Sequence, residues 1–382
     1  MNNAATSWPK PEPVIGRLMW GVTELSAAPG RAGSPALESE RAIFEAREEV
    51  AKFIGARDSS RVVFTLNATA ALNLAIGGLV RAGDRVITTS MDHNSVARPL
   101  ARAAEEMDVE VVRVTADEAG ELQATQILDE IDDRTRMIIL THASNVTGAI
   151  QPVEEIAEAL SAREGSRPLL LVDAAQSAGV LPIDVDRSGI DLLAAPGHKS
   201  LYGPQGTGIL YVGEGADPVP LMEGGTGGES TLVRQPTSLP DRYESGTPNI
   251  PGIVALGEAV RFIGDRGIDT IRAHENRLMG TLIEGLAGVR GVRLFGPCRP
   301  DRQVAVLSFT VEGMDPAEVG TYLERTEGIV TRVGLHCSPH SHRTIGTYPE
   351  GTIRVSPGIF NVDSDILSLV RGVERLAARR SR

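Results

Sequence analysis

Lysine is scarce in this 382-residue chain, whose side chains offer an amine only at Lys10, Lys52 and Lys199. Lys199 stands apart because the apolar run Leu192–Ala194 precedes it and the glycine-rich stretch Gly203–Gly208 follows it. Partial burial lowers the pKa of a lysine and makes its amine a nucleophile that forms Schiff bases. A solvated loop lysine is the alternative that the local sequence leaves open.

A carboxylate closes a second apolar run, Leu169–Val172, and Gln176 stands three residues after this Asp173. Ligands of open α/β sheets bind at the carboxyl ends of the strands. A carboxylate there can pair with the protonated pyridine nitrogen of a cofactor and make its ring an electron sink. An aspartate that caps the start of a helix is the alternative.

Two further segments follow predicted strands. Ala68 and Thr69 open a predicted helix, where backbone N–H groups and a hydroxyl can bind an anion or can simply cap the helix. His93 follows the apolar run Arg85–Thr89, so its flat imidazole can stack on a ring cofactor. A purely structural role is the alternative for His93.

A cysteine lies among histidines near the C-terminus, where His336, Cys337, His340 and His342 follow Arg332. Thiolate is the reactive form of cysteine, and nearby cationic groups favour it, so His336 and His340 are candidates for tuning Cys337. Cysteine and histidine at short spacings can also bind zinc. An inert loop cysteine is the third possibility.

The glycine clusters Gly203–Gly208 and Gly224–Gly228 invite comparison with a phosphate-binding loop. In the nucleotide-binding loop the Lys-Ser pair follows the glycines, whereas Lys199 and Ser200 come before them here. The order of these residues argues against ATP binding.

Short apolar runs alternate with helical stretches over the first two thirds of the chain, which predicts an α/β domain with a mostly parallel sheet. We expect strands over Arg61–Thr65, Arg85–Thr89, Glu110–Val114, Met137–Thr141, Leu169–Val172, Leu192–Ala194 and Ile209–Val212. We expect helices over Ser39–Gly55, Ala68–Val80, Ala97–Met107, Ala124–Ile131 and Val153–Ala162. The prolines of Pro9–Pro13 predict an extended arm.

After Ile250 the pattern changes to that of a smaller α+β domain. Its expected helices are Ile250–Asp265, Ile268–Leu286, Pro316–Arg325 and Ser364–Ala378, and its expected strands are Val292–Phe295, Ala305–Val311 and Thr352–Val355. We expect a large domain over residues 15–265 and a small domain made of residues 1–14 and 266–382.

Composition excludes several classes of protein. The chain is 41% hydrophobic and 23% charged with a formal net charge of −12, which fits a globular protein and argues against a nucleic-acid-coating one. No apolar run reaches the roughly 20 residues of a membrane-spanning helix. The N-terminal residues do not have the pattern of a secretory signal, and two cysteines cannot build a disulfide framework, so a cytoplasmic location is expected.

Taken in order, these segments resemble the class V aminotransferase family of pyridoxal-phosphate (PLP) enzymes, in its cysteine desulfurase and selenocysteine lyase branch. The resemblance extends over nearly the whole chain. It is carried by Asn3–Thr6, Asn67–Asn73, Asp92–Asn94, Ser144–Gly148, Val172–Gln176, Gly197–Lys199, Glu244–Asn249, Arg332–Cys337 and Thr352–Arg354. It implies PLP as cofactor and the fold of type I PLP-dependent transferases, with a seven-stranded large domain and a smaller α+β domain.

The resemblance also implies roles. Lys199 would form a Schiff base with PLP, Asp173 would pair with the pyridine nitrogen, Gln176 would bond the ring hydroxyl and His93 would stack on the ring. The phosphate would be held by Ala68, Thr69 and His198, and by Thr247 of a partner subunit in a homodimer. Asn145, Arg354 and Arg332 would bind the amino-acid substrate, and Cys337 would accept sulfur.

The activity that this resemblance implies is that of an L-cysteine desulfurase. Lys199 would move the Cα proton, and Cys337 would take the substrate sulfur as a persulfide, so that alanine is released. The sulfur would then pass from Cys337 to an acceptor protein. Three alternatives remain open. One is a PLP-dependent C–S β-lyase of specialised metabolism that releases pyruvate and ammonia from a larger cysteine conjugate. The others are a transaminase or decarboxylating enzyme, and a scaffold that has lost the cofactor.

Three features depart from the family pattern. Pro196 stands where a serine or threonine usually contacts the phosphate, so Thr226 is a candidate to supply that contact. The apolar residues and aspartate that often precede the Asn3–Thr6 motif are missing. The three histidines around Cys337 are unusual and bear on substrate identity.

Overall fold

Seven strands form the central sheet of the computed structural model, which describes every residue except 26, 31–32, 164, 166, 229–230 and 381–382. The strands are β1 (Val62–Thr65), β2 (Arg85–Thr89), β3 (Glu110–Val114), β4 (Thr135–Thr141), β5 (Leu169–Asp173), β6 (Leu192–Pro196) and β7 (Gly208–Val212). Their order is β1-β7-β6-β5-β4-β2-β3; β7 runs antiparallel to both neighbours, and the other pairs are parallel. The predicted mostly parallel, seven-stranded α/β arrangement is confirmed.

Strand β5 shows why the middle of this sheet is a continuous apolar run. Leu170 and Val172 belong to one buried hydrophobic cluster, whereas Leu169 and Leu171 belong to another. Successive side chains of a strand point to opposite faces, so a strand covered on both faces must be apolar at every position. The sheet therefore carries its polar, functional side chains at strand ends and not along the strands.

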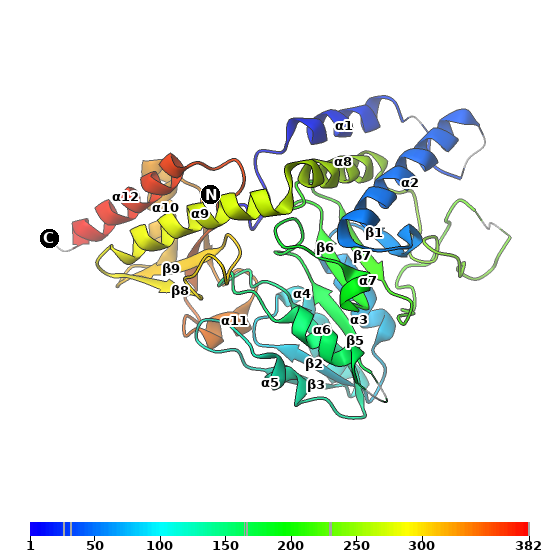
Figure 1. Ribbon diagram of the computed structural model, residues 1–382, viewed down its shortest axis with the longest axis horizontal. Helices are drawn as coiled ribbons and strands as arrows, with labels where there is room; N and C mark the ends of the chain where they lie inside the picture. The colour runs from blue at the N-terminus through cyan, green and yellow to red at the C-terminus, as the bar shows by residue number, and fades with distance from the viewer. Residues whose placement is uncertain (26, 31–32, 164, 166, 229–230, 381–382) are drawn as a thin grey trace.

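Helices cover both faces of the sheet (Figure 1). They are α1 (Glu12–Thr23), α2 (Ser34–Ile54), α3 (Ala68–Leu79), α4 (Asn94–Met107), α5 (Ala124–Leu128), α6 (Val153–Ser161), α7 (Val185–Ser188) and α8 (Ile250–Arg266), together with the 3-10 turn Ser59–Arg61. Local signals set several of their ends. Helix α3 begins where the Asn67 side chain accepts the N–H of Ala70 at 2.9 Å, and α2 ends at Gly55, whose φ of 72° favours glycine.

The predicted extended arm is wrong at its C-terminal end. Helix α1 already begins at Glu12, and Pro13 occupies its first turn. Proline is tolerated there because the first N–H groups of a helix have no partner within the helix. The arm is therefore shorter than Pro9–Pro13, and α1 is a helix that the sequence pattern did not reveal.

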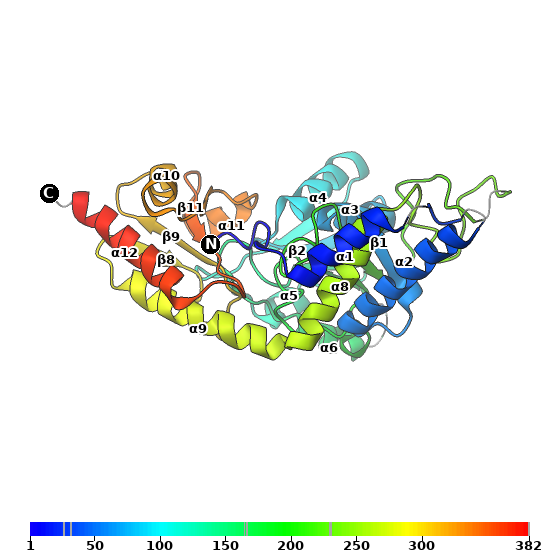
Figure 2. The same cartoon turned by 90° about the horizontal axis from the view of Figure 1, so that it is seen from above.

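A second, antiparallel sheet has the order β10-β11-β9-β8. Its strands are β8 (Val292–Phe295), β9 (Leu307–Val311), β10 (Arg332–Gly334) and β11 (Thr352–Val355), and its helices are α9 (Ile268–Ala287), α10 (Pro316–Glu327), α11 (Pro339–Thr344) and α12 (Asp363–Arg380). Figures 1 and 2 show this unit at one end of the molecule, with the long α9 beside it. The expected strand at Ala305 begins two residues later, at Leu307, and the division near residue 265 stays a prediction.

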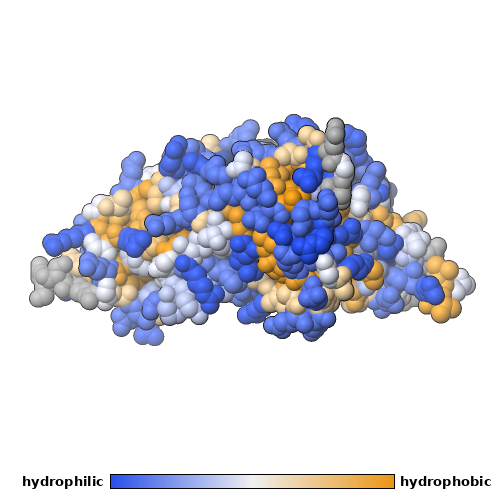
Figure 3. All heavy atoms as spheres, turned by 90° about the horizontal axis from the view of Figure 1, so that it is seen from below, coloured by the Kyte–Doolittle hydropathy of each residue, from blue (hydrophilic) through white to orange (hydrophobic). Residues whose placement is uncertain are grey.

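The N-terminal residues return to this second sheet. Asn2 forms a β-bridge with Ser356, just after β11. On the surface, hydrophobic side chains form separate patches among hydrophilic ones (Figure 3). None of the helices in the described part of the chain has the length and apolar character needed to cross a bilayer.

Candidate active site

A cavity of about 180 Å³ lies where three neighbouring parallel strands end. Thr141, Asp173 and Pro196 are the last residues of β4, β5 and β6, and all three line it. This is the carboxyl edge of the sheet, where open α/β folds bind ligands. The lining includes ten of the predicted site residues: Ala68, Thr69, His93, Asn145, Asp173, Gln176, His198, Lys199, Arg332 and Arg354.

Lys199 sits in a tight turn after β6. The Gly203 N–H donates to the Gly197 carbonyl at 2.7 Å, and the Tyr202 N–H donates to the Lys199 carbonyl at 2.9 Å. Burial lowers the pKa of Lys199 to about 8, and the negative charge of Asp173 acts in the opposite direction. A larger share of this amine is therefore neutral, and nucleophilic, than in an ordinary lysine.

Asp173 is 2% exposed, and its Oδ1 accepts the N–H of Ala175 at 2.9 Å. Burial raises the pKa of Asp173, while that N–H and the charge of Lys199 lower it. The residues after Asp173 form a turn and not a helix, so the alternative of a helix cap is not supported. Gln176 also lines the cavity and donates its Nε2 hydrogen to the Ala4 carbonyl at 3.0 Å.

A hydroxyl network joins the N-termini of α3 and α4. Thr69 Oγ1 and Ser95 Oγ lie 2.7 Å apart, and Ser95 Oγ lies 2.9 Å from His93 Nδ1. The Ser95 N–H donates to His93 Nδ1 at 3.0 Å, so the neutral ring carries its proton on Nε2. Ser95 was missed in the sequence, although its place in the first turn of a helix beside His93 was the available signal.

Two of the three histidines that line the cavity, His93 and His198, are neutral at physiological pH. Burial first, and then the charges of Lys199 and the nearby arginines, lower the pKa of His93 to about 4. Burial and the charges of Lys199 and Lys10 lower the pKa of His198 to about 4. A neutral imidazole can present its face to a ring or donate a hydrogen bond without adding positive charge.

Two arginines of the second sheet line the same cavity. Arg332 and Arg354 are register partners on the antiparallel strands β10 and β11, so their side chains stand on the same face. Arg354 is 1% exposed; burial and the charge of Arg332 lower its pKa to about 9, so it stays protonated at neutral pH. Like charges placed opposite each other are unfavourable, and a bound carboxylate relieves that repulsion.

Cys337 lies beside these arginines, in a turn with left-handed backbone. His336 and Cys337 have φ angles of 49° and 61°. The Cys337 thiol is exposed and lies 3.2 Å from Nη2 of Arg332. Asn145 holds the residues on both sides of it, because its Nδ2 donates to the His336 carbonyl at 2.7 Å and its Oδ1 accepts from Ser338 Oγ at 2.8 Å.

Two of the three histidines around Cys337, His336 and His342, have structural partners. Ser308 donates to the Val146 carbonyl at 2.7 Å and Thr352 donates to Ser308 at 3.0 Å, so His336 must donate its Nε2 proton to Thr352, 3.0 Å away. Burial lowers the pKa of His336 to about 2, so it adds no positive charge beside Cys337. Arg332 supplies that charge instead. His342 is buried, and its Nδ1 lies 2.7 Å from Thr347 Oγ1.

Two predicted residues lie in other cavities. Thr247 lies in a separate apolar cavity of about 350 Å³. Thr226 lies in a third hollow, with the glycine-rich segment around it, so within one chain it does not line the cavity of Lys199, and the phosphate contact expected of it stays a prediction. Within the described residues, no group of three histidine, cysteine or acidic side chains is arranged to hold a metal ion.

The chemistry of this donor set fits PLP. Thr141 Oγ1, His198 Nδ1 and Arg354 Nε belong to lining residues, are buried, and have no hydrogen-bond partner among the described residues. Asp173 is a buried carboxylate in the same cavity as the start of α3, where N–H groups suit a phosphate. A ligand that carries both a cationic ring nitrogen and a phosphate would satisfy both groups.

Comparisons with known proteins show the family of this chain. The model of the aminotransferase class-V family matches residues 1–369. A protein of Methanothermobacter thermautotrophicus named "probable cysteine desulfurase" is 36% identical over 98% of this chain and 94% of its own length. The cysteine desulfurase of Yersinia pestis is 32% identical over 98% of this chain and 92% of its own.

A solved structure gives the same result for the fold. The cysteine desulfurase of Thermococcus onnurineus superposes with a TM-score of 0.88 at 29% identity and covers 99% of this chain and 94% of the other. The predicted type I PLP-enzyme fold is thus confirmed. With the family model matched along almost its whole length, the chain belongs to the class V aminotransferase family.

Proposed function

We propose that this protein is a PLP-dependent cysteine desulfurase that takes the sulfur of L-cysteine onto Cys337. The observation that carries the proposal is the pairing of Arg332 and Arg354 across β10 and β11. It provides an amino-acid carboxylate site beside the thiol and in the same cavity as Lys199.

Several residues would hold PLP. Lys199 is the amine to which it would attach, Asp173 would pair with the ring nitrogen, His93 would cover the ring, and the start of α3 with His198 would bind the phosphate; all of these residues line the cavity. When bound, PLP supplies a carbonyl carbon that condenses with amines and an electron-withdrawing ring. Asp173 is suited to pair with the protonated ring nitrogen, because a cation beside this carboxylate offsets the free-energy cost of burying its charge.

The remaining steps belong to side chains of the chain. Arg354 and Arg332 orient the substrate through its carboxylate. The Lys199 amine accepts the Cα proton, for which its lowered pKa suits it. The Cys337 sulfur attacks the substrate sulfur, an S–S bond forms, and the Cβ–S bond breaks with its electron pair left on the substrate carbon. Protonation of that carbon and return of a proton from Lys199 to Cα give alanine, and an acceptor thiol then removes the sulfur from Cys337.

A homodimer is part of the proposal. Thr247 lines an apolar cavity together with Leu66, Leu221 and Met222, which are 66%, 53% and 62% exposed. Exposed apolar residues gathered around a cavity suit a surface that a second copy covers. That copy would receive Thr247 at its own phosphate site. A cytoplasmic location and a sulfur-acceptor protein complete the proposal.

The test is a product analysis by mass spectrometry. The PLP-loaded parent, Cys337→Ala and the control Cys298→Ala each receive L-cysteine and a dithiol reductant. We expect alanine and sulfide from the parent and from Cys298→Ala, and neither from Cys337→Ala. Pyruvate and ammonia from all three would show a β-eliminating lyase. Absence of turnover in a protein that still binds PLP would refute L-cysteine as the substrate.

A further inference from the structure

Four hydrogen-bond donors of the N-terminal segment converge on the carbonyl oxygen of His198. The Ser7 N–H lies 3.0 Å from it and Lys10 Nζ lies 2.9 Å from it. The hydroxyls of Thr6 and Ser7 each lie 3.2 Å from the same oxygen. A carbonyl oxygen has two lone pairs, so four donors are more than it needs to satisfy its hydrogen-bonding capacity. The carbonyl belongs to the peptide bond that joins His198 to Lys199.

Lys10 is the charged member of this set. Its Nζ also donates to Ser7 Oγ at 2.8 Å, so Lys10 orders a second donor of the cluster. Burial lowers the pKa of Lys10 to about 8. Lys10 is thus still mostly protonated at neutral pH. Its charge is partly buried, and no carboxylate of the described residues raises its pKa to offset the cost of that burial. Hydrogen bonds from a charged donor are the stronger ones.

The same segment is anchored at its other end to the second sheet. The Asn3 N–H donates to the Ser356 carbonyl at 3.1 Å, and the Ala4 N–H donates to Ser356 Oγ at 2.9 Å. Ser356 follows Arg354 by two residues. Between these ends, the Ala4 carbonyl accepts from Gln176. Residues 3–10 therefore connect the strand of the carboxylate-binding arginine to the turn of Lys199.

We propose that Lys10 is a positioning residue that fixes the backbone of Lys199, with residues 3–10 as the brace between the two sheets. Small displacements of a reacting group reduce the efficiency of the reaction it takes part in. The direction of the Lys199 side chain depends on the peptide bond that precedes it. Lys10 itself does not belong to the cavity lining, so it acts through that peptide bond. The proposal rests on the proposed function only for the attachment of PLP to Lys199.

The experiment compares Lys10→Met, Lys10→Arg and Lys52→Met. Methionine keeps the length of the side chain and removes its donors, whereas arginine keeps donors and charge. Lys52 is an exposed lysine on α2 and is the matched control. PLP affinity is measured by visible absorbance on the cofactor-free protein. Hydride reduction and peptide mapping locate the modified lysine. Hydrogen–deuterium exchange reports the Ser7 amide, which donates to the His198 carbonyl.

We expect Lys10→Met to weaken PLP binding by about tenfold and to raise exchange at the Ser7 amide by a similar factor. Lys10→Arg should recover most of both, and Lys52→Met should match the parent. Equal PLP affinity in Lys10→Met and the parent would overturn the proposal, even if the thermal midpoint fell, because it would show a structural role only. Failure of arginine to recover either property would overturn it too.

These measurements use no substrate, so they are independent of whether L-cysteine is turned over. A parent chain that takes up no PLP would refute the proposed function. The exchange rate of the Ser7 amide in Lys10→Met would then decide the brace: an unchanged rate overturns it and a raised rate supports it.

Discussion

The guanidinium of Arg332 lies 3.2 Å from the sulfur of Cys337, and among the described residues it is the cationic group that contacts the thiol. The neighbouring His336 cannot take this part, because burial keeps it neutral and its Nε2 proton is donated to Thr352. A guanidinium in contact with sulfur stabilises negative charge that develops there. Arg332 therefore has two tasks, one toward the substrate carboxylate and one toward the nucleophile.

We predict that Arg332→Gln slows alkylation of Cys337 by iodoacetamide about threefold to tenfold at neutral pH. Peptide mass spectrometry follows the reaction, with the half-buried Cys298 as internal reference. Arg343→Gln is the control, since Arg343 lies over the Tyr348 ring on the same segment. Equal alkylation rates in Arg332→Gln and the parent would contradict this assignment.

The turn of Cys337 depends on the amide of Asn145, which holds the His336 carbonyl and the Ser338 hydroxyl. We predict that Ser338→Ala lowers alanine formation from L-cysteine about threefold to tenfold, because it removes one of the two bonds that the Asn145 side chain makes to this left-handed turn. Ser341→Ala is the matched control: its hydroxyl is equally buried on the same segment but has no partner among the described residues.

Steady-state rates at saturating L-cysteine provide the comparison. An equal loss in Ser338→Ala and Ser341→Ala would show that the segment is merely sensitive to reduced side-chain volume. Unchanged turnover in Ser338→Ala would contradict the prediction, because the other hydrogen bonds of the turn, among them that of the Asn94 N–H to the Cys337 carbonyl, would then suffice.

Local sequence signals predicted most of this fold. The bounds of β2, β3, β8 and β11 match the expected ones, because each strand is a short stretch rich in β-branched or aromatic residues with turn residues or charged residues near its ends. The elements that were missed are short or begin unusually: α7, α11 and β10 have four, six and three residues, too few to show a period. Helix α1 was hidden by the prolines at its start.

The site was predicted only in part, because several of its contacts join residues that lie far apart along the chain. Residues at strand ends, such as Asp173 and Lys199, could be proposed from position alone because parallel strands end at one edge of a sheet. The contacts that support these residues could not be proposed in this way. Lys10 meets the His198 carbonyl across 188 residues, and Ser338 meets Asn145 across 193. Nothing in either local sequence indicates these contacts.

The lowered pKa of Lys199 gives a pH dependence. Burial reduces this pKa to about 8, so the neutral amine predominates above pH 8 and not only above the ordinary value near 10.5. We predict that the rate of PLP attachment to the cofactor-free protein rises about tenfold per pH unit below pH 8 and levels off above it. Stopped-flow absorbance measures this rate.

Asp173→Asn is the informative variant for this profile. The Asp173 charge raises the pKa of Lys199, so its removal should move the midpoint of the profile to lower pH. A parent midpoint near 10.5, or a shift to higher pH in Asp173→Asn, would contradict the predicted electrostatics.

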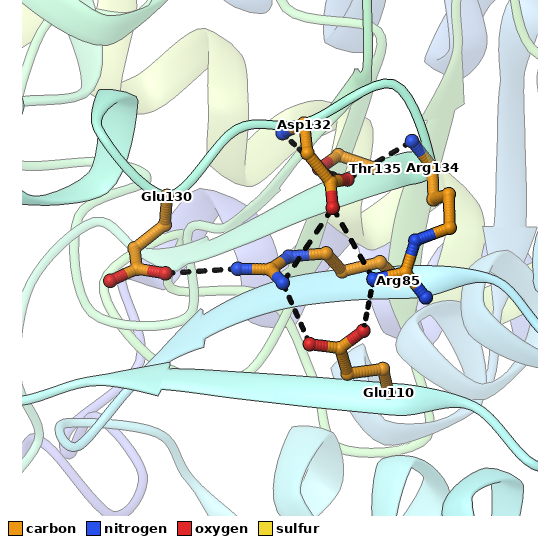
Figure 4. A network of polar contacts seen from close by, with 6 residues as sticks. All are labelled: Arg85, Glu110, Glu130, Asp132, Arg134 and Thr135. Carbon is orange, nitrogen blue, oxygen red and sulfur yellow. Dashed lines mark hydrogen bonds and ion pairs between the residues drawn. The ribbon is translucent and has the colours of Figure 1, made fainter.

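The opposite edge of the central sheet should affect stability and not chemistry. Arg85 is the first residue of β2, and Glu110 is the first residue of β3. Figure 4 shows Arg85 between the carboxylates of Glu110, Glu130 and Asp132. Arg134 also pairs with Glu110 and Asp132. We predict that Arg85→Ala lowers the free energy of unfolding by about 1 kcal/mol, a small amount because its partners are exposed, and leaves turnover unchanged. Urea denaturation at low and high salt measures it. Arg299→Ala is the control, since Arg299 and Asp301 form an ion pair with 62% and 64% exposed side chains that should contribute almost nothing. Lost turnover in a folded Arg85→Ala protein would show that this edge is coupled to the cavity.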